Sequence, residues 1–197
     1  MPSKPTAARA TSERLLDVAE SLLLEHGYDQ VSVRAVNAAA GMNPAAVHYH
    51  FGSKEALVGA LLERRLAPLW QDQLAELTAR RRHGDPPGVA ELVDVVLTPL
   101  AELTRDPRGR LHLQLLARVV LHRWDVGFAS QWFGLGPWVS LLRAVRADLS
   151  TAEAGRRWLL TFDLVLHTLA APDTTAPPGR AAFRTLRSFV IAGLDAP

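Results

Sequence analysis

Cysteine is absent from the chain, which excludes disulfide bonds, thiolate catalysis and cysteine-based redox sensing. Neither sign of charge predominates, because the formal net charge is only +2 over 197 residues. No run of 18 apolar residues occurs, and the first segment, MPSKPTAARATSER, has no apolar stretch of the kind that directs secretion. We therefore expect a soluble, cytoplasmic protein with no membrane partner.

Motifs of the common enzyme classes are missing as well. The sequence has no Gly-x-Ser-x-Gly elbow, no phosphate-binding glycine loop and no cluster with metal-ligand spacing. His48 and His50 are two residues apart, so on a helix they point to different faces and would not share a metal ion. We expect a protein that is not an enzyme and has no cofactor or metal.

The segment from residue 31 to residue 57 contains alternating start and stop signals for short helices. Ser32 is placed as an N-cap for an alanine-rich helix, and Gly41 ends that helix with a residue that tolerates a left-handed backbone. Asn43 followed by proline then predicts a second helix over Pro44–Phe51. Two short helices joined by a glycine turn indicate a helix-turn-helix at about residues 32–51, whose second helix enters the major groove of DNA.

Several side chains of this segment have the chemistry for DNA contact. Small residues at the start of the second helix let the backbone approach the bases, and alanine methyls can touch thymine methyls. Ser32 and Arg34 are expected to contact phosphates. Residues 1–54 contain five basic and five acidic side chains, so binding must depend on a few well-placed groups. The N-cap and the small residues that follow it are also candidate DNA-binding residues: Asn43, Pro44, Ala45 and Ala46.

The sequence from Ser32 to Leu57, and above all HYHFGSKEAL from His48, resembles the DNA-binding domain of TetR-family transcriptional regulators. Members of that family are all-helical homodimers with an amino-terminal three-helix domain and a larger helical domain that binds a small molecule and dimerises. The resemblance implies base or backbone contacts for Tyr49 and His50 and a phosphate contact for Lys54. His48 departs from the usual tyrosine, although an imidazole N–H can still donate to phosphate.

Apolar residues at helical spacing continue through the rest of the chain. The expected fold class is all-α, and the resemblance implies a helix-turn-helix domain at residues 1–54 and a ligand-binding and dimerisation domain at residues 55–197. In the long fourth helix, RRLAPLW resembles the PsrA-like subgroup, and Pro68 is expected to kink that helix. The expected helices are Thr11–His26, Ser53–Arg82, Val89–Thr104, Arg110–Trp124, Gly127–Leu149, Thr151–Ala171 and Gly179–Leu194.

Aromatic residues crowd the stretch from Trp124 to Trp138, where FGLGPW interrupts the helical pattern. An apolar pocket with a few polar anchors is the usual form of a small-molecule site, although an aromatic cluster is more often plain core. Gln114, His122 and Asp163 are further possible polar anchors. The candidate ligand-binding residues are Trp70, His112, Trp124, Phe128, Trp132, Phe133, Trp138, Phe162 and His167.

The last two helical patterns carry apolar residues on more than one face, which indicates either burial against a second subunit or filling of the monomer core. The candidate dimer residues are Trp158, Leu166, Phe183, Leu186, Phe189 and Val190. The resemblance then implies a homodimeric repressor on a double-stranded, inverted-repeat operator, released by a small, largely apolar effector. Two alternatives remain: a TetR-like activator, and a helical protein-interaction module that does not bind DNA.

Overall fold

The computed structural model describes residues 4–171 and 179–197, and every regular element in these ranges is helical, which confirms the predicted all-α class. None of these helices is long and apolar enough to cross a membrane. In chain order the elements are α1 (Lys4–His26), η1 (Tyr28–Gln30), α2 (Val33–Ala39), α3 (Ala46–Phe51), α4 (Lys54–Arg82), α5 (Val89–Leu103), α6 (Pro107–Leu121), η2 (Gln131–Phe133), α7 (Leu135–Val145), α8 (Thr151–Leu169) and α9 (Arg180–Asp195).

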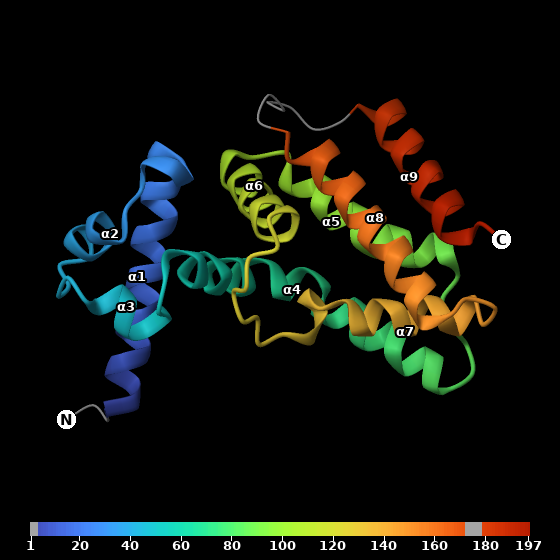
Figure 1. Cartoon of the computed structure of the whole chain (residues 1–197), viewed down its shortest axis with the longest axis horizontal. Coiled ribbons are helices and arrows are strands. Elements are labelled where there is room, and N and C mark those ends of the chain that lie inside the picture. Colours follow the sequence, from blue (N-terminus) through green and yellow to red (C-terminus); the bar gives the residue numbers. More distant parts are fainter. Residues whose placement is uncertain (1–3, 172–178) are drawn as a thin grey trace.

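The helices form two groups, and α4 joins them (Figure 1). Helices α1, α2 and α3 pack together at one end, while α5 to α9 pack together at the other. Helix α6 lies at the boundary, because it contacts α1 as well as α4, α5 and α8. The first group therefore connects to the second through two helices, α4 by chain continuity and α6 by packing.

The turn between α2 and α3 follows the capping signals of the sequence. The Ser32 hydroxyl accepts a hydrogen bond from the Ala35 amide at 3.1 Å, and Gly41 has a φ of 65°. The Asn43 side chain accepts from the Ala45 amide at 2.9 Å. Regular helix begins at Ala46, two residues later than predicted, because residues 44–45 form a tight turn that leads into α3.

A buried asparagine that the sequence analysis did not identify holds this turn in place. Asn37 is 1% exposed, and its side chain donates to the Pro44 carbonyl and accepts from the Val47 amide at 3.0 Å. Both functions of one amide are thus satisfied by the start of α3. The angle between the two short helices is therefore fixed by a side chain of the first one.

Other predicted helix boundaries were also wrong. Helix α1 begins at Lys4 instead of Thr11. Helix α6 begins at Pro107 because the Asp106 carboxylate caps the Arg108 and Gly109 amides, an Asx-Pro start of the same kind as at Asn43. The predicted helix Gly127–Leu149 is a loop containing η2 up to residue 134, and only α7 is helical.

Helix α4 continues through Pro68 without a break, and its second half slopes away from the direction of its first half (Figure 1). This bend agrees with the expected effect of an internal proline, which removes one backbone hydrogen bond. Its buried face, which includes Leu61, Leu62 and Leu66, packs into the core that it shares with α1, α5, α6 and α7. The helix is thus fixed along its length on one side.

Candidate DNA-binding and ligand-binding sites

Helix α3 presents its polar face outward and anchors itself by its apolar face. Val47 is fully buried, whereas Tyr49 is 84% exposed and His48 is also exposed. Tyr49 lies edge-on to the half-buried His50, with ring centroids 5.1 Å apart. The exposed phenol of Tyr49 on a short, anchored helix is available to contact a groove, as the side chains of recognition helices are.

Other predicted DNA contacts precede this helix in the chain and are exposed. Ser32 and Arg34 are exposed at the start of α2, and Pro44 and Ala45 are exposed in the turn before α3. Ser32 uses its oxygen as the cap of α2, which leaves its hydroxyl hydrogen free to donate. In the part of the chain that the structure describes, the guanidinium of Arg34 has no ion-pair partner.

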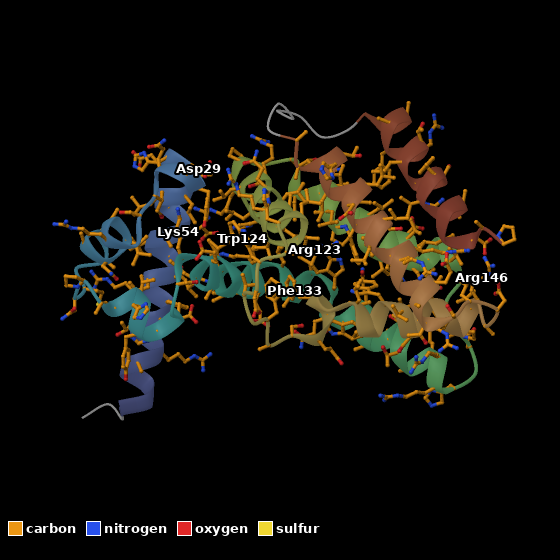
Figure 2. The ribbon with its side chains drawn as sticks, in the orientation of Figure 1. Asp29, Lys54, Arg123, Trp124, Phe133 and Arg146 are labelled. Atoms are coloured by element: carbon orange, nitrogen blue, oxygen red, sulfur yellow. The ribbon has the colours of Figure 1, made fainter. Side chains whose placement is uncertain are left out.

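Lys54, at the start of α4 (Figure 2), is held against Tyr28. Its Nζ donates to the Tyr28 carbonyl at 2.6 Å and lies 3.7 Å from the centre of the Tyr28 ring. Burial lowers the pKa of Lys54 more than the nearby charges of Asp29 and Glu55 raise it. Burial also raises the pKa of Tyr28 to about 12, together with its hydrogen bond to Glu55. An ammonium has three donors, so a phosphate can still bind Lys54 while Tyr28 fixes its position.

A cavity of about 370 Å³ lies among α4, α5, α6, α8 and the segment 123–138. The structure places seven of the predicted ligand-binding residues in its wall, namely Trp70, Trp124, Phe128, Trp132, Phe133, Trp138 and Phe162. Phe128 and Phe133 stack with ring centroids 4.2 Å apart. The volume is that of a small-molecule site, and almost all of the wall is aromatic or aliphatic.

The loop that carries these aromatics is fastened to α4. Glu63 accepts hydrogen bonds from the amides of Ala129, at 3.2 Å, and Ser130. Gly59 lets the loop approach closely, because a Cβ at that position would lie 2.6 Å from the Val126 side chain. The part of the cavity wall formed by the loop is therefore positioned by the same helix that begins in the DNA-binding region.

Comparison with known proteins gives the family. A family model described as bacterial regulatory proteins, tetR family, matches residues 15–61, which contain the helix-turn-helix. The HTH-type transcriptional repressor Rv3405c of Mycobacterium tuberculosis is 32% identical over 164 residues, which cover 83% of this chain and 73% of that protein. The chain belongs to the TetR family of transcriptional regulators. It is a helix-turn-helix protein of the DNA-binding class.

Other relatives of this TetR-family regulator are more distant. The HTH-type transcriptional regulator UidR of Escherichia coli K12 is 28% identical over 110 residues, which cover 56% of this chain and about half, 51%, of that protein. GusR of Salmonella enterica has the same fold with a TM-score of 0.54, at 21% identity and with 98% and 97% of the two chains covered. FadR of Bacillus halodurans, a fatty acid degradation regulator, also has a TM-score of 0.54, at 18% identity and with 93% and 96% covered.

Two of the predicted ligand contacts of this TetR-family chain, His112 and His167, lie outside the aromatic cavity. His167 is exposed on α8, where its ring bonds the Asp163 carbonyl one turn away. His112 is 5% exposed and faces α1, where its Nε2 lies 2.6 Å from a carboxylate oxygen of Glu20. A histidine on an apolar helix pattern can face any buried neighbour, and periodicity alone did not say which.

The Glu20 carboxylate ties three helices together. It accepts from His112 of α6 and from Arg65 of α4, whose Nε lies 3.0 Å away. Burial raises the pKa of Glu20, but the hydrogen bonds from Arg65 and His112 outweigh it, so the pKa lies below its ordinary value. Burial lowers the pKa of His112 by more than Glu20 raises it. An ionised carboxylate with a neutral imidazole is therefore the state favoured at neutral pH.

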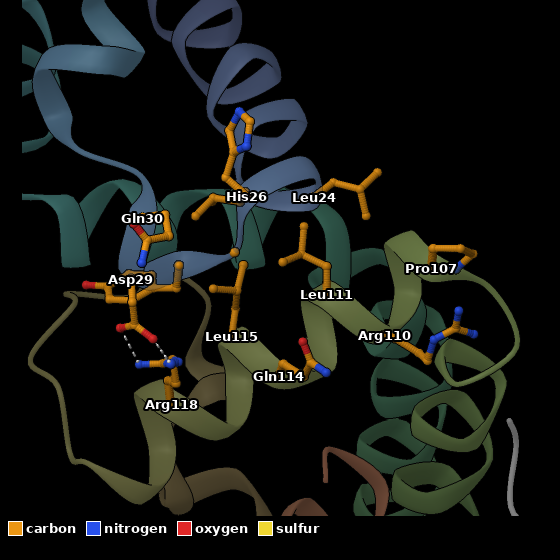
Figure 3. Close-up of a pocket in the computed structure, with 13 residues that line it drawn as sticks. Leu24, His26, Asp29, Gln30, Pro107, Arg110, Leu111, Gln114, Leu115 and Arg118 are labelled. Carbon is orange, nitrogen blue, oxygen red and sulfur yellow. Dashed lines mark hydrogen bonds and ion pairs between the residues drawn. The ribbon is translucent and has the colours of Figure 1, made fainter. Parts of the chain in front are cut away.

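The other expected anchors lie away from the aromatic cavity. Gln114 lines a separate groove of about 480 Å³ between the end of α1 and α6, where Arg118 pairs with Asp29 at 2.6 Å (Figure 3). His122 and Asp163 are exposed. The cavity wall also contains residues that the sequence analysis missed, which come from the inner faces of α5, α6 and α8 and from two bends: Val96, Leu100, Leu116, Val119, Val120, Arg123, Gly134, Leu135 and Leu159.

The predicted dimer residues divide between core and surface. Trp158 is fully buried, and its indole donates to the Trp138 carbonyl behind the cavity, so its assignment to the subunit surface was wrong. Leu166 was also misassigned, because it is 1% exposed and lines the cavity. Leu186 and Val190 point inward from α9, whereas Phe189 is 68% exposed. Phe183 is half-buried.

Proposed function

We propose that this protein is a homodimeric repressor that binds an inverted-repeat operator and leaves it when a small, largely apolar ligand occupies the aromatic cavity. Residues 1–54 would form its DNA-binding domain and residues 55–197 its ligand-binding and dimerisation domain. The observation that carries the proposal is the contact of a cavity residue, Trp124, with the aromatic ring that holds Lys54.

The dimer would form through the outer faces of α8 and α9. Leu160 and Phe189 are 69% and 68% exposed, large values for apolar side chains. Phe189 lines a shallow groove with the small residues Ala181, Thr185 and Ser188 and with the longer Arg184. Exposed apolar side chains beside small ones support a helix-pairing surface, and two-fold pairing would present two α3 helices to successive major grooves.

Coupling between the cavity and the DNA would pass through Tyr28. The Trp124 ring lines the cavity and lies 5.1 Å from the Tyr28 ring. Tyr28 holds Lys54 through its carbonyl and its ring, and its hydroxyl donates to Glu55 at 3.1 Å. A ligand that moves Trp124 would therefore disturb the support of a predicted phosphate contact. By linkage, DNA would weaken the binding of that ligand by the same factor.

A second connection, from the cavity through α6 to α1, supports the same coupling. Leu116, Val119 and Val120 of α6 line the cavity, and His112, one turn before Leu116, bonds Glu20 of α1. A small shift of α6 would be felt at α1 through a buried, charged hydrogen bond, which tolerates little change in length. Both connections join the cavity to the first three helices.

The experiment is a fluorescence titration with N-phenyl-1-naphthylamine, an uncharged probe of apolar cavities. Affinity is measured for the free protein and for the protein saturated with an operator duplex selected from a random pool. We expect at least a fivefold weaker affinity in the operator complex, within the usual range of allosteric coupling. Equal affinities would contradict the proposed release. Transcription from a promoter that carries the operator, with and without the protein, separates repression from activation.

A further inference from the structure

The aromatic cavity contains one charged side chain, that of Arg123, at the bend between α6 and the aromatic loop (Figure 2). We propose that the cavity binds an apolar anion, a carboxylate or sulfonate on an aromatic or aliphatic body, and that Arg123 binds its acidic head. This inference rests on the proposal that the cavity is the ligand site, and it adds the charge of the ligand.

The first argument is the hydrogen-bonding character of the wall. Its polar side-chain groups are the Arg123 guanidinium and the indole N–H groups of four tryptophans, which are all donors. Those of Trp70 and Trp138 are already bonded to backbone carbonyls. Among the described residues, those of Trp124 and Trp132 have no protein acceptor. A wall that offers donors and no side-chain acceptor suits a ligand whose polar group only accepts.

The second argument is the backbone at Arg123. Its φ is 54°, and it is the one non-glycine residue with a positive φ in the described ranges. The Arg123 amide donates to the Val120 carbonyl and the Trp124 amide to the Val119 carbonyl, which together form a Schellman end to α6. Glycine is the residue that this position favours. An arginine there is not explained by the local conformation, so the side chain is a candidate for function.

The third argument is that Arg123 is uncommitted. In the described part of the chain its guanidinium forms no ion pair and no hydrogen bond, although Asp125 lies two residues away. About half of the other arginines after residue 100, such as Arg146 and Arg187, are paired with carboxylates, whereas the exposed Arg123 remains available to a ligand at the edge of the cavity. A cation would be attracted by the aromatic faces but repelled by Arg123, so the lining as a whole favours an anion.

The test uses two fluorescent probes with the same body. 8-Anilinonaphthalene-1-sulfonate carries a negative charge, and N-phenyl-1-naphthylamine is the same molecule without the sulfonate. Binding is measured for the wild type, Arg123→Gln and Arg123→Gly. We expect both variants to bind the sulfonate about tenfold more weakly and the amine within twofold of wild type, since only a charge-assisted contact is lost. Arg108→Gln, which removes an exposed charge elsewhere on α6, is the control and should bind both probes as wild type does.

The glycine variant separates function from stability. Because glycine suits a positive φ, Arg123→Gly should raise the thermal midpoint by about 2–4 °C while it weakens binding of the sulfonate. Unchanged sulfonate affinity in both variants, with the amine still bound, would overturn the role of Arg123 and leave the proposed function intact. If the amine shows no saturable binding to the wild type, the cavity is not an apolar ligand site, and both proposals fail.

A second series of ligands, which need not fluoresce themselves, tests the charge of the head group. Biphenyl-4-carboxylate, biphenyl-4-methanol and biphenyl-4-methylamine share one body and carry a negative, a neutral and a positive head. In displacement of N-phenyl-1-naphthylamine, we expect the carboxylate to bind most tightly and the ammonium least tightly. Binding of the carboxylate equal to or weaker than that of the ammonium would overturn the inference.

Discussion

The ring of Trp124 lies 5.1 Å from the ring of Tyr28, with the two planes tilted by 40°. This contact joins the cavity wall to the residue that supports Lys54. Arg118 of α6 covers the same Tyr28 ring at 5.0 Å and pairs with Asp29, so the contact is enclosed by polar partners. The two groups of helices thus meet at Tyr28 as well as at the Glu20 carboxylate.

Replacing Tyr28 should weaken operator binding in a way that depends on its ring. Tyr28→Leu removes the ring beneath Lys54, and we expect about a tenfold loss of operator affinity, since cation–π and positioning contacts are lost together. Tyr28→Phe keeps the ring and loses only the hydrogen bond to Glu55, so its affinity should stay within about threefold of wild type. Fluorescence anisotropy with a labelled operator measures both. Equal losses in the two variants would show that the ring is not what matters.

Stability should fall on acidification through His112. The folded-state pKa of His112 lies below its ordinary value of 6.5, so the neutral side chain contributes stability that is fully present above about pH 6.5. That contribution is lost as the pH falls towards the folded pKa, because the unfolded chain takes up a proton first. The Glu20 pKa is lowered too, but its contribution is lost only below its ordinary value of 4.5.

Urea denaturation at about pH 8 and about pH 5.5 tests this prediction. His112→Gln keeps a donor for Glu20 but does not titrate, so it should lose less unfolding free energy than the wild type between these two values. If wild type and His112→Gln lose the same amount, His112 is not the group responsible.

The close approach of the aromatic loop to α4 should make Gly59 intolerant of a side chain. Gly59→Ala would place a Cβ 2.6 Å from Val126, and we expect a loss of about 1–3 kcal/mol together with weaker binding of the naphthylamine probe. Gly155→Ala is the matched control, because it lies inside α8 and its Cβ would meet Val139 at an ordinary contact distance of 3.9 Å, so alanine should stabilise the protein by about 0.5–1 kcal/mol. Thermal unfolding compares the two, and a tolerated Gly59→Ala would contradict the geometry of the loop.

The outer face of α9 should control the oligomeric state. Phe189→Glu places a charge in the proposed subunit contact, where an unpaired carboxylate is costly to bury, so we expect a monomer at micromolar concentration. Leu24→Glu changes another exposed apolar side chain, on α1, and should remain dimeric. Light scattering after size exclusion gives the mass, and a Phe189→Glu protein that stays dimeric would place the interface elsewhere.

The local structure of the helix-turn-helix could be predicted well because its signals are local. Ser32, Gly41 and Asn43 each act within three residues, and the capping contacts found for them are of that range. The role of Asn37 could not be foreseen, since its partners lie seven and ten residues away. Capping is visible in a sequence, whereas a buried polar contact needs the fold.

The cavity was predictable only in part for the same reason. Aromatic crowding indicated the loop, but the contributions of α5 and α6 depend on how these helices pack. Trp158 and Leu166 were misassigned because an apolar face has the same pattern whether it meets the core or a second subunit. Arg123 was missed because a left-handed backbone at a residue other than glycine has no sequence signal.

Selection of bound sequences from a random duplex pool tests the central claim most directly, when it is done in parallel with wild type and Tyr49→Ala. Tyr49 is 84% exposed, so its replacement should leave the thermal midpoint unchanged. The account predicts that wild type enriches an inverted repeat whose half-sites lie about 34–36 Å or a multiple of one turn apart, and that Tyr49→Ala binds this sequence at least tenfold more weakly. If folded wild-type protein enriches no sequence, or if the variant binds the recovered sequence equally well, the account of a dimeric repressor that reads DNA through α3 is contradicted.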